Sequence, residues 1–304
     1  MKSELKWHGG KAAARDTGPI PVTSRLRISA FLSGFLSLLF PRRCPYCGDI
    51  ASPAGCLICP ECEKSLPYIR GKRCEKCGKE LGAASVHLCR GCEKHRRSFE
   101  HALCLLRYDG VSADMMAGLK YKHKKEYADA FAWLLYRHLG REIREFPAAV
   151  FVPVPVHKKR KRMRGYNQAE EICRSLAAFL NGDREALLRM GIPRDQLSGF
   201  GDAEVSGNGK PAGTRYHVCT DLLIRKKNTR AQKNLSAAGR LLNLQAAFEA
   251  APDWERKHGR LPGAVILVDD IYTTGATMEA CTGTLRAAGV KRVYGLCVCA
   301  GADV

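Results

Sequence analysis

The pattern of apolar positions divides the chain beyond Arg97 into two kinds of segment. Short runs of β-branched and other apolar residues predict buried strands, whereas apolar residues that recur every three to four positions predict amphipathic helices. Strands are expected at 102–108, 148–156, 216–224, 264–271 and 291–300, and helices at 111–121, 126–139, 167–180 and 276–288. Strands that alternate with helices predict an α/β fold with a mostly parallel sheet covered on both faces.

Two stretches interrupt this alternation. The residues at 181–214 are rich in Gly, Asp, Pro and Ser, which predicts a helix followed by a long mobile loop. The stretch at 232–244 fits either a short helix or an ordered loop.

The first forty residues combine a basic tail with the apolar run Ile28–Phe40. This run has thirteen residues, fewer than the ~18 expected of a membrane-spanning helix. A signal-peptide core is one interpretation, but the run leads directly to Pro41 and Cys44 without a small-residue cleavage site. We therefore expect an amphipathic or buried helix in a cytoplasmic protein, and a peripheral contact with the inner face of a membrane is compatible with it.

Cysteines dominate the segment from 41 to 97, where they form a tandem repeat. CPYCG at 44–48 recurs thirty residues later as CEKCG at 74–78, and CPECEK at 59–64 recurs as CRGCEK at 89–94. Two C-x₂-C pairs per module suit a structural, tetrahedral Zn²⁺ site with four thiolate ligands. The predicted zinc ligands are Cys44, Cys47, Cys59 and Cys62 in the first module and Cys74, Cys77, Cys89 and Cys92 in the second. A segment so poor in large apolar side chains needs the folding energy of the metal.

The ligand sets stay open at two points. Cys56 also forms a C-x₂-C pair with Cys59, and a crossed pairing between the modules is compatible with the sequence. His87 and His95 lie near the cysteines of the second module and are alternative ligands, although both fit surface histidines better. The remaining cysteines lie in predicted strands and helices and are expected to be small core residues: Cys104, Cys173, Cys219, Cys281, Cys297 and Cys299.

The net charge of the chain indicates which kind of partner to expect. The 304 residues include 50 Lys and Arg against 30 Asp and Glu, a formal net charge of +20. This surplus favours polyanionic partners such as nucleic acid, phosphorylated ligands or an anionic membrane. Hydrophobic residues make up 45% of the chain, which excludes global disorder. The length allows roughly two domains.

The clearest chemical motif is VILVDDIYTTGAT at 265–277. An apolar strand ends in Asp269 and Asp270, at the edge where open α/β sheets bind ligands. The following residues open a helix, whose free backbone N–H groups and threonine hydroxyls are donors for a phosphate. Gly275 permits a backbone conformation that other residues resist. The two carboxylates can accept hydrogen bonds from a ribose diol and help to hold a Mg²⁺ ion.

This stretch resembles the phosphoribosyl-pyrophosphate motif of type I phosphoribosyltransferases, which has four apolar residues, two acidic residues and then T-T-G-[AS]-T. The resemblance implies the type I phosphoribosyltransferase fold, with Asp269 and Asp270 at the ribose hydroxyls and Mg²⁺ bound together with phosphoribosyl pyrophosphate. It places these residues around the 5′-phosphate: Thr273, Thr274, Gly275, Ala276 and Thr277.

Further segments are similar to the ComF family of competence-associated phosphoribosyltransferase-like proteins. They are the cysteine-rich modules, the strand with Pro153 and Pro155, the R-G-[FY]-N-Q-[AS] match at Arg164–Ala169 and the segment TRAQKNLSAAGRLLN at 229–243. The resemblance covers roughly Pro41 to Ala300 and leaves out the first forty residues and the 183–214 loop. It implies three parts: a tail with a short helix at 1–40, a double zinc ribbon at 41–97 and a phosphoribosyltransferase-like domain at 98–304.

Six Lys and Arg residues crowd the eight positions that follow the strand at 148–156. We interpret this run as a basic loop, with contacts to pyrophosphate or to DNA from His157, Lys158, Lys159, Arg160 and Arg164. Arg164 and Asn167 fit equally a role in bracing the loop. The 226–243 stretch is interpreted as a mobile lid over the site or as a basic surface helix.

Three functions are compatible with these features. The resemblance implies a phosphoribosyl-pyrophosphate-binding protein that handles single-stranded DNA in natural transformation or another DNA transaction. The second function is an active phosphoribosyltransferase on an unidentified nitrogen acceptor, although no residue can be named as its general base. The third is a scaffold whose zinc ribbons dock a helicase or a membrane-associated DNA-uptake partner.

Overall fold

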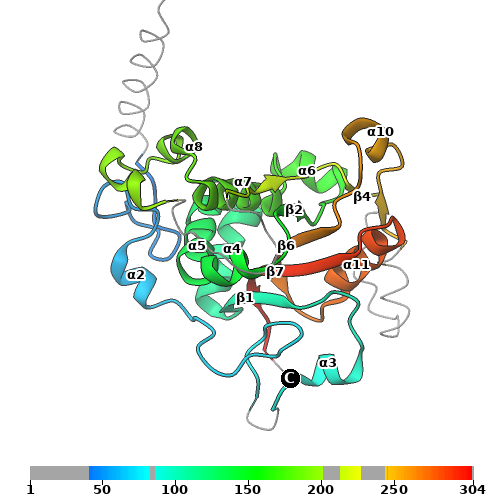
Figure 1. Ribbon diagram of the computed structural model, residues 1–304. Helices are drawn as coiled ribbons and strands as arrows, with labels where there is room; N and C mark the ends of the chain where they lie inside the picture. The colour runs from blue at the N-terminus through cyan, green and yellow to red at the C-terminus, as the bar shows by residue number, and fades with distance from the viewer. Residues whose placement is uncertain (1–40, 83–85, 201–212, 227–243, 245, 303–304) are drawn as a thin grey trace, which may run out of the picture. The chain divides into compact units, whose positions relative to one another are not determined.

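The computed structural model describes residues 41–82, 86–200, 213–226, 244 and 246–302 (Figure 1). Residues Arg42–Val304 form one compact unit, so the cysteine modules and the sheet belong together. The predicted features at Ile28–Phe40 and 229–243, and residues 201–212 of the long loop, lie outside the described residues. Within the described residues, no helix is both long and apolar enough to cross a bilayer.

A five-stranded sheet forms the centre, in the order β1 (Ala102–Arg107), β7 (Arg292–Ala300), β6 (Ala264–Tyr272), β2 (Val150–Pro153) and β3 (His217–Val218). Each neighbouring pair is parallel. The prediction of an α/β fold with a mostly parallel sheet is therefore confirmed.

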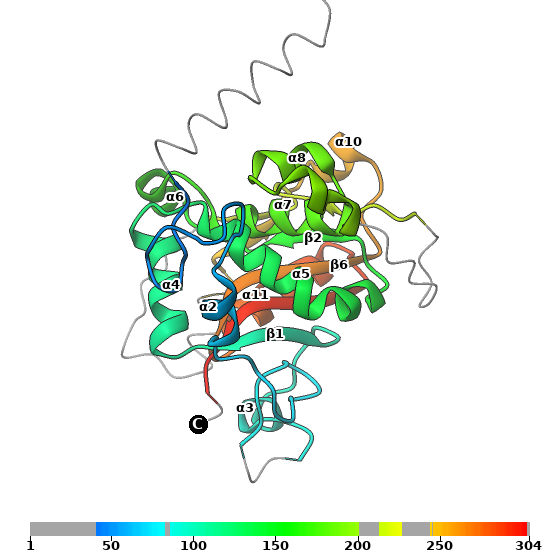
Figure 2. The same cartoon turned by 90° about the vertical axis from the view of Figure 1, so that its left-hand side faces the viewer.

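Helices cover both faces of this sheet (Figures 1 and 2). One face carries α4 (Gly110–Tyr121), α5 (Tyr127–Glu145) and α7 (Gln168–Asn181), and the other carries α11 (Ala276–Ala287). Successive side chains of β6 point to opposite faces of the sheet, so the strand contributes to the core on each face. Ile266 and Val268 belong to the core under α5 and α7, whereas Val265 and Leu267 belong to the core under α11.

The segment predicted as one strand at 216–224 is divided, which corrects that prediction. After β3 the chain bends, and β4 (Leu223–Arg225) pairs antiparallel with β5 (Phe248–Ala250) in a separate two-stranded sheet. The Asp221 carboxylate holds the bend, because it contacts Trp254 Nε1 at 3.2 Å and His258 Nε2 at 2.7 Å. Both partners lie on α10 (Trp254–His258), an element without a strong periodic signal in the sequence.

The basic run was expected to be a loop, but it forms α6 (Lys158–Arg164). His157 caps the start, since its side chain accepts a hydrogen bond from the Lys159 backbone N–H. Gly165, in a left-handed conformation with φ of 88°, ends the helix. Further along, α8 (Arg184–Arg189) and the 3₁₀ helix η1 (Arg194–Gly199) precede the undescribed part of the long loop.

The two cysteine modules have the same local structure. Their short helices are α2 (Pro60–Lys64) and α3 (Arg90–Lys94). In each module the glycine after the first pair closes a turn: Gly48 N donates to Cys44 O and Gly78 N to Cys74 O, both at 2.9 Å. Isolated bridges also recur, Arg43 with Ile50 and Arg73 with Glu80. The structure thus repeats as the sequence does.

Candidate metal centres and phosphate loop

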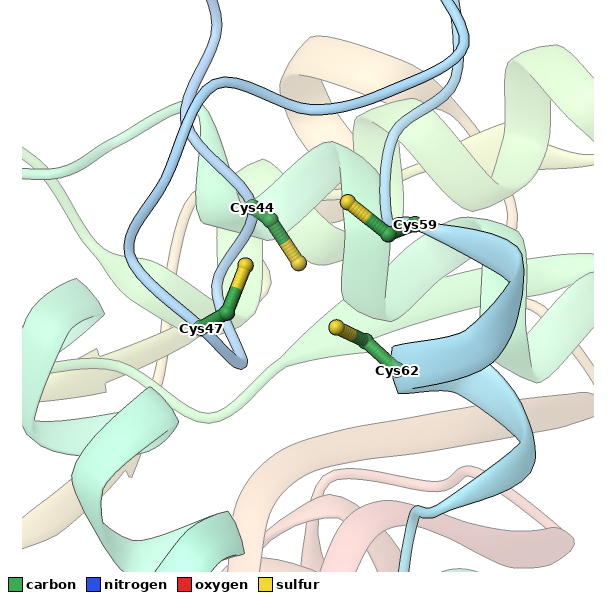
Figure 3. Close-up of side chains that lie close together, drawn as sticks. All are labelled: Cys44, Cys47, Cys59 and Cys62. Atoms are coloured by element: carbon green, nitrogen blue, oxygen red, sulfur yellow. The ribbon is translucent and has the colours of Figure 1, made fainter.

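The cysteine sulfur atoms gather in two groups of four, one in each module. Figure 3 shows the first group, with all four sulfur atoms turned toward a common point. Within each group the ligand atoms lie within 4.8 Å of one another. Tetrahedral zinc with Zn–S bonds of about 2.3 Å requires sulfur separations of roughly 3.8 Å, so both groups fit a structural Zn²⁺ ion. The groups are Cys44, Cys47, Cys59 and Cys62, and Cys74, Cys77, Cys89 and Cys92.

Nearby residues considered as alternative ligands lie outside these groups. Cys56 is half-buried, and burial followed by the neighbouring Cys59 raises the pKa of its thiol to about 11. His87 instead contacts the Glu75 carboxylate at 2.7 Å, and His95 is exposed. The sulfur atoms therefore pair by module and not across modules.

The two centres differ in their surroundings. The second group is buried throughout, whereas Cys47 of the first group is exposed. Cys44 belongs to the core formed with α5 and α7, but all four cysteines of the second group belong to the core that contains Leu267 and Tyr272 of β6. The first zinc ribbon therefore packs on the helical layer, and the second packs behind the strand that carries the acidic pair.

The phosphate loop connects β6 to α11. Thr273 and Thr274 are exposed, and Gly275 occupies the N-cap position of α11 with φ of 77°. A Cβ atom at Gly275 would collide with the Tyr272 hydroxyl group, so both the backbone conformation and the ring beneath require glycine. In the first turn of α11 the Ala276 N–H donates to Thr274 Oγ1 at 3.4 Å. The N–H groups at the start of a helix lack carbonyl partners within the helix, so this end of α11 can donate to an anion.

Asp270 is held by a buried ion pair that local sequence patterns do not indicate. Its Oδ1 atom lies 2.8 Å from Nζ of Lys120, at the end of α4, and its Oδ2 atom lies 2.5 Å from Nε2 of Gln168. The side chains of Lys120 and Asp270 are only 16% and 7% exposed. Burial alone would lower the pKa of Lys120, but the Asp270 carboxylate outweighs it and raises that pKa. Asp270 thus braces the site with both of its oxygens.

Asp269 has the opposite environment. Burial, followed by repulsion from Asp270, raises the pKa of its carboxyl to about 7. Its Oδ1 atom accepts a hydrogen bond of 2.9 Å from the Asp270 backbone N–H. Because ionisation of this buried carboxyl is unfavourable, a bound cation or a hydroxyl donor would stabilise its carboxylate form. Between the two acidic residues, Asp269 therefore fits a Mg²⁺ ion or a ribose hydroxyl better than Asp270 does.

The predicted basic contacts divide into exposed and buried groups. Lys158, Lys159 and Arg160 are exposed on α6. Arg164 is buried, and its guanidinium donates to Gln168, the residue that holds Asp270. The side chain of Asn167 donates to Val154 O at 3.1 Å. The last two geometries favour the bracing role that the sequence left open for Arg164 and Asn167.

Comparison with known proteins agrees with these features. The model of the double zinc ribbon domain family matches residues 35–93. Competence protein F of Haemophilus influenzae is 30% identical over 154 residues, which is 50% of this chain and 51% of that protein. DNA utilization protein YhgH of Escherichia coli K12 is 24% identical over 185 residues, 60% of this chain and 63% of that protein. The counterpart from Salmonella typhi is 26% identical over 184 residues.

The chain thus spans about half to two thirds of the length of the curated relatives that it matches. These homologues confirm the resemblance to the ComF family, and the family model confirms the double zinc ribbon. Together with the two groups of four cysteines, they indicate two structural zinc sites.

Proposed function

We propose that this homologue of competence protein F binds phosphoribosyl pyrophosphate at the phosphate loop and acts on DNA during its uptake or utilisation. One observation carries the ligand assignment. Gly275, in a left-handed conformation, opens α11 three residues after β6, which carries Asp269 and Asp270 near its end. This arrangement places ribose acceptors and phosphate donors within the nine residues from 269 to 277.

Each part of the loop has its own role in this proposal. The backbone N–H groups and hydroxyls of Thr273–Thr277 hold the 5′-phosphate. Asp269 faces the ribose hydroxyls and the Mg²⁺ ion that accompanies the pyrophosphate. Asp270 keeps the end of β6 in place through its bonds to Lys120 and Gln168. In this proposal Asp269 contacts the ligand, and Asp270 stabilises the strand that carries Asp269.

The DNA part of the proposal rests on the names of the relatives and on a basic surface. Competence protein F is named for competence, and DNA utilization protein YhgH for the utilisation of DNA. In this chain, His123 Nδ1 lies 3.3 Å from Arg164 O and Arg42 Nη1 lies 3.4 Å from Glu126 O. These contacts connect α6, the KYKHKK segment at 120–125 and the start of the first zinc ribbon. We propose that single-stranded DNA follows this surface through its phosphates.

An exposed aromatic side chain lies on the same surface. Tyr121 is 70% exposed, and the Arg164 guanidinium lies 5.7 Å from the centroid of its ring. A large exposed ring beside cations is typical of the sites where proteins stack the bases of single strands. It supports single-stranded DNA over duplex DNA as the partner.

Catalytic phosphoribosyl transfer to a nitrogen acceptor is the second candidate. The observation that favours it is the position of Asp269 on β6, four residues before Thr273, where its carboxyl would lie beside the ribose of a ligand bound at the phosphate loop. Release of pyrophosphate on mixing with candidate acceptors measures this activity directly.

Calorimetric titration with phosphoribosyl pyrophosphate and Mg²⁺ tests the ligand assignment. We expect binding by the wild-type protein and a loss of at least tenfold in affinity on Asp269→Asn. The exposed Asp114→Asn on α4 is the matched control and should leave the affinity unchanged. Equal affinities in all three proteins would refute the proposed site.

A further inference from the structure

The segment between the second zinc ribbon and β1 contacts the phosphate loop directly. Arg97 Nη2 donates a hydrogen bond of 2.8 Å to the backbone oxygen of Thr274, 177 residues away in the chain. The next residue, Ser98, donates its backbone N–H to both carboxylate oxygens of Glu279, at 2.9 and 3.2 Å. Thr274 lies in the loop and Glu279 in the first turn of α11. Two consecutive residues therefore hold both sides of Gly275.

Arg97 also contacts the zinc ribbon itself. Its guanidinium lies beside the Cys92 sulfur and the Tyr272 ring. A Cβ atom on Gly91 of α3 would lie 3.9 Å from Arg97 Nη2 and 3.9 Å from Cys89 Sγ. The guanidinium thus lies between the zinc-ligand cysteines and the phosphate loop.

The floor of the loop depends on the same zinc ribbon. Tyr272, which supports Gly275, makes an edge-to-face contact with Phe99 at a centroid distance of 6.4 Å. Lys79, next to the turn glycine of the second zinc ribbon, places Nζ 5.8 Å from the centroid of the Tyr272 ring. Tyr272 and the four cysteines of the second group share one core. A shift of this ribbon would move the ring on which Gly275 rests.

The first zinc ribbon has different neighbours. Its residue Cys44 packs in the core of α5 and α7. Glu63 of α2 bonds to Arg137 and His138 on α5, at 2.9 and 3.3 Å. These contacts support the helical layer, on the face of the sheet away from α11 (Figure 1).

We propose that the second zinc ribbon is a positioning element of the phosphate loop, with Arg97 as the positioning residue. Ligand affinity then depends on the second zinc site and not on the first. The affinity statement rests on the proposed function, namely that the loop binds phosphoribosyl pyrophosphate. The physical reason is that a charged hydrogen bond fixes the Thr274 carbonyl, and with it the direction of the following backbone N–H groups.

Replacement of Arg97 tests the positioning role in the full-length, zinc-loaded protein. Arg97→Met should lower the affinity for phosphoribosyl pyrophosphate with Mg²⁺ by about tenfold or more, as expected for a lost charged hydrogen bond. It should also speed hydrogen exchange of the Thr274–Thr277 amides without ligand, while both zinc ions stay bound. Arg97→Lys should recover part of the affinity. The exposed neighbour Arg96→Met is the matched control and should match the wild-type protein.

Unchanged affinity and unchanged exchange in Arg97→Met would overturn the proposal, and so would loss of the second zinc ion. The two readouts also separate this inference from the proposed function. If the wild-type protein does not bind phosphoribosyl pyrophosphate, the proposed function fails. The exchange rates of the loop in Arg97→Met and Arg96→Met then decide the positioning role alone.

A second arm compares the two metal sites. Cys89→Ser removes a ligand of the second zinc site, and Cys62→Ser removes one of the first. We expect Cys89→Ser to lower ligand affinity and to speed exchange in the loop, and Cys62→Ser to leave both within about twofold of wild type while losing its own zinc ion. Equal effects of the two substitutions would contradict the proposal, because both zinc ribbons would then act only through general stability.

Discussion

Lys120 and Asp270 form a buried ion pair of 2.8 Å although 150 residues separate them in the chain. The pair joins the last turn of α4 to the end of β6, and Gln168 of α7 completes it. Three elements of the fold thus meet at one carboxylate. Since a buried charge is costly without its partner, the pair fixes the geometry of the site only while both members are present.

Removal of one partner should therefore be costly. Lys120→Met leaves the Asp270 charge uncompensated, and we expect it to lower the free energy of unfolding by about 3–5 kcal/mol. The double variant Lys120→Met with Asp270→Asn should recover much of this loss, because neither charge of the pair then remains. Denaturant unfolding measures both values. Lys122→Met, two residues along and exposed, is the control, and a similar loss there would contradict the prediction.

Gly275 permits a sharper test of the loop geometry. Gly275→Ala places a Cβ atom against the Tyr272 hydroxyl and forces a left-handed conformation on a residue with a side chain. We expect a loss of about 1–3 kcal/mol in stability and a larger relative loss in affinity for phosphoribosyl pyrophosphate. Gly165→Ala, at another left-handed glycine whose Cβ would meet open space, serves as the control. It should cost stability but not affinity.

The sequence predicts those parts of the molecule in which the interacting groups are only a few residues apart in the chain. Cys74 and Cys77, or Gly275 and the threonines around it, act at short range, so their spacing predicts a metal site and a phosphate loop. Lys120 occurs in the basic segment KYKHKK, which has the pattern of a solvated helix end. Its burial against Asp270 depends on how α4 packs beside β6, and the local sequence pattern does not predict that contact.

Two errors in the predicted elements have similar causes. The basic run that follows the strand was interpreted as a loop, but His157 and Gly165 cap the segment at 158–164 as a helix. The apolar alternation at 216–224 favoured one strand, but Asp221 bonds to Trp254 and His258, more than thirty residues downstream, and bends the chain. In both cases the deciding groups are caps or partners outside the apolar pattern.

Metal removal should affect more than the zinc ribbons. We expect about two zinc ions per chain in protein prepared under reducing, zinc-replete conditions. Since the second group of cysteines shares its core with Leu267 and Cys297 of the sheet, chelation should lower the melting temperature of the sheet as well. Atomic absorption and thermal unfolding before and after chelation measure both effects. A metal content near zero, or a sheet that melts at the same temperature without zinc, would contradict this view.

Asp269 predicts a specific dependence of stability on pH. Its folded pKa of about 7 lies above the ordinary value of an aspartate, so the folded state binds this proton more tightly than the unfolded chain. The stabilising contribution of the proton is full at pH below about 4 and is lost as the pH rises through 7. Asp269→Asn should therefore exceed the wild type in stability by ~1–3 kcal/mol at pH 8, and the difference should shrink toward pH 4. Asp114→Asn should show no such trend.

The last prediction concerns DNA and depends on α6. Phosphate contacts release counterions, so the logarithm of the affinity for a single strand should fall with the logarithm of the salt concentration by about 0.7 per contact. Lys158, Lys159, Arg160 and Arg162 are exposed, and Lys158 and Arg162 lie one helical turn apart. Only one face of so short a helix can contact the DNA single strand. Replacement of all four basic residues by Ser should therefore remove one or two phosphate contacts. The slope should then become shallower by roughly 0.7–1.4.

A set of four exposed basic residues elsewhere provides the control for charge alone: Arg256, Lys257, Arg260 and Lys291. Their replacement by Ser changes the net charge by the same amount and should leave the slope unchanged. Filter binding of an oligonucleotide between 50 and 300 mM salt measures all three proteins. A weaker affinity with an unchanged slope in the α6 variant would mean that these residues act through the fold. Equal slopes in all three proteins would mean that α6 does not contact DNA, and the ligand-binding role would then stand without it.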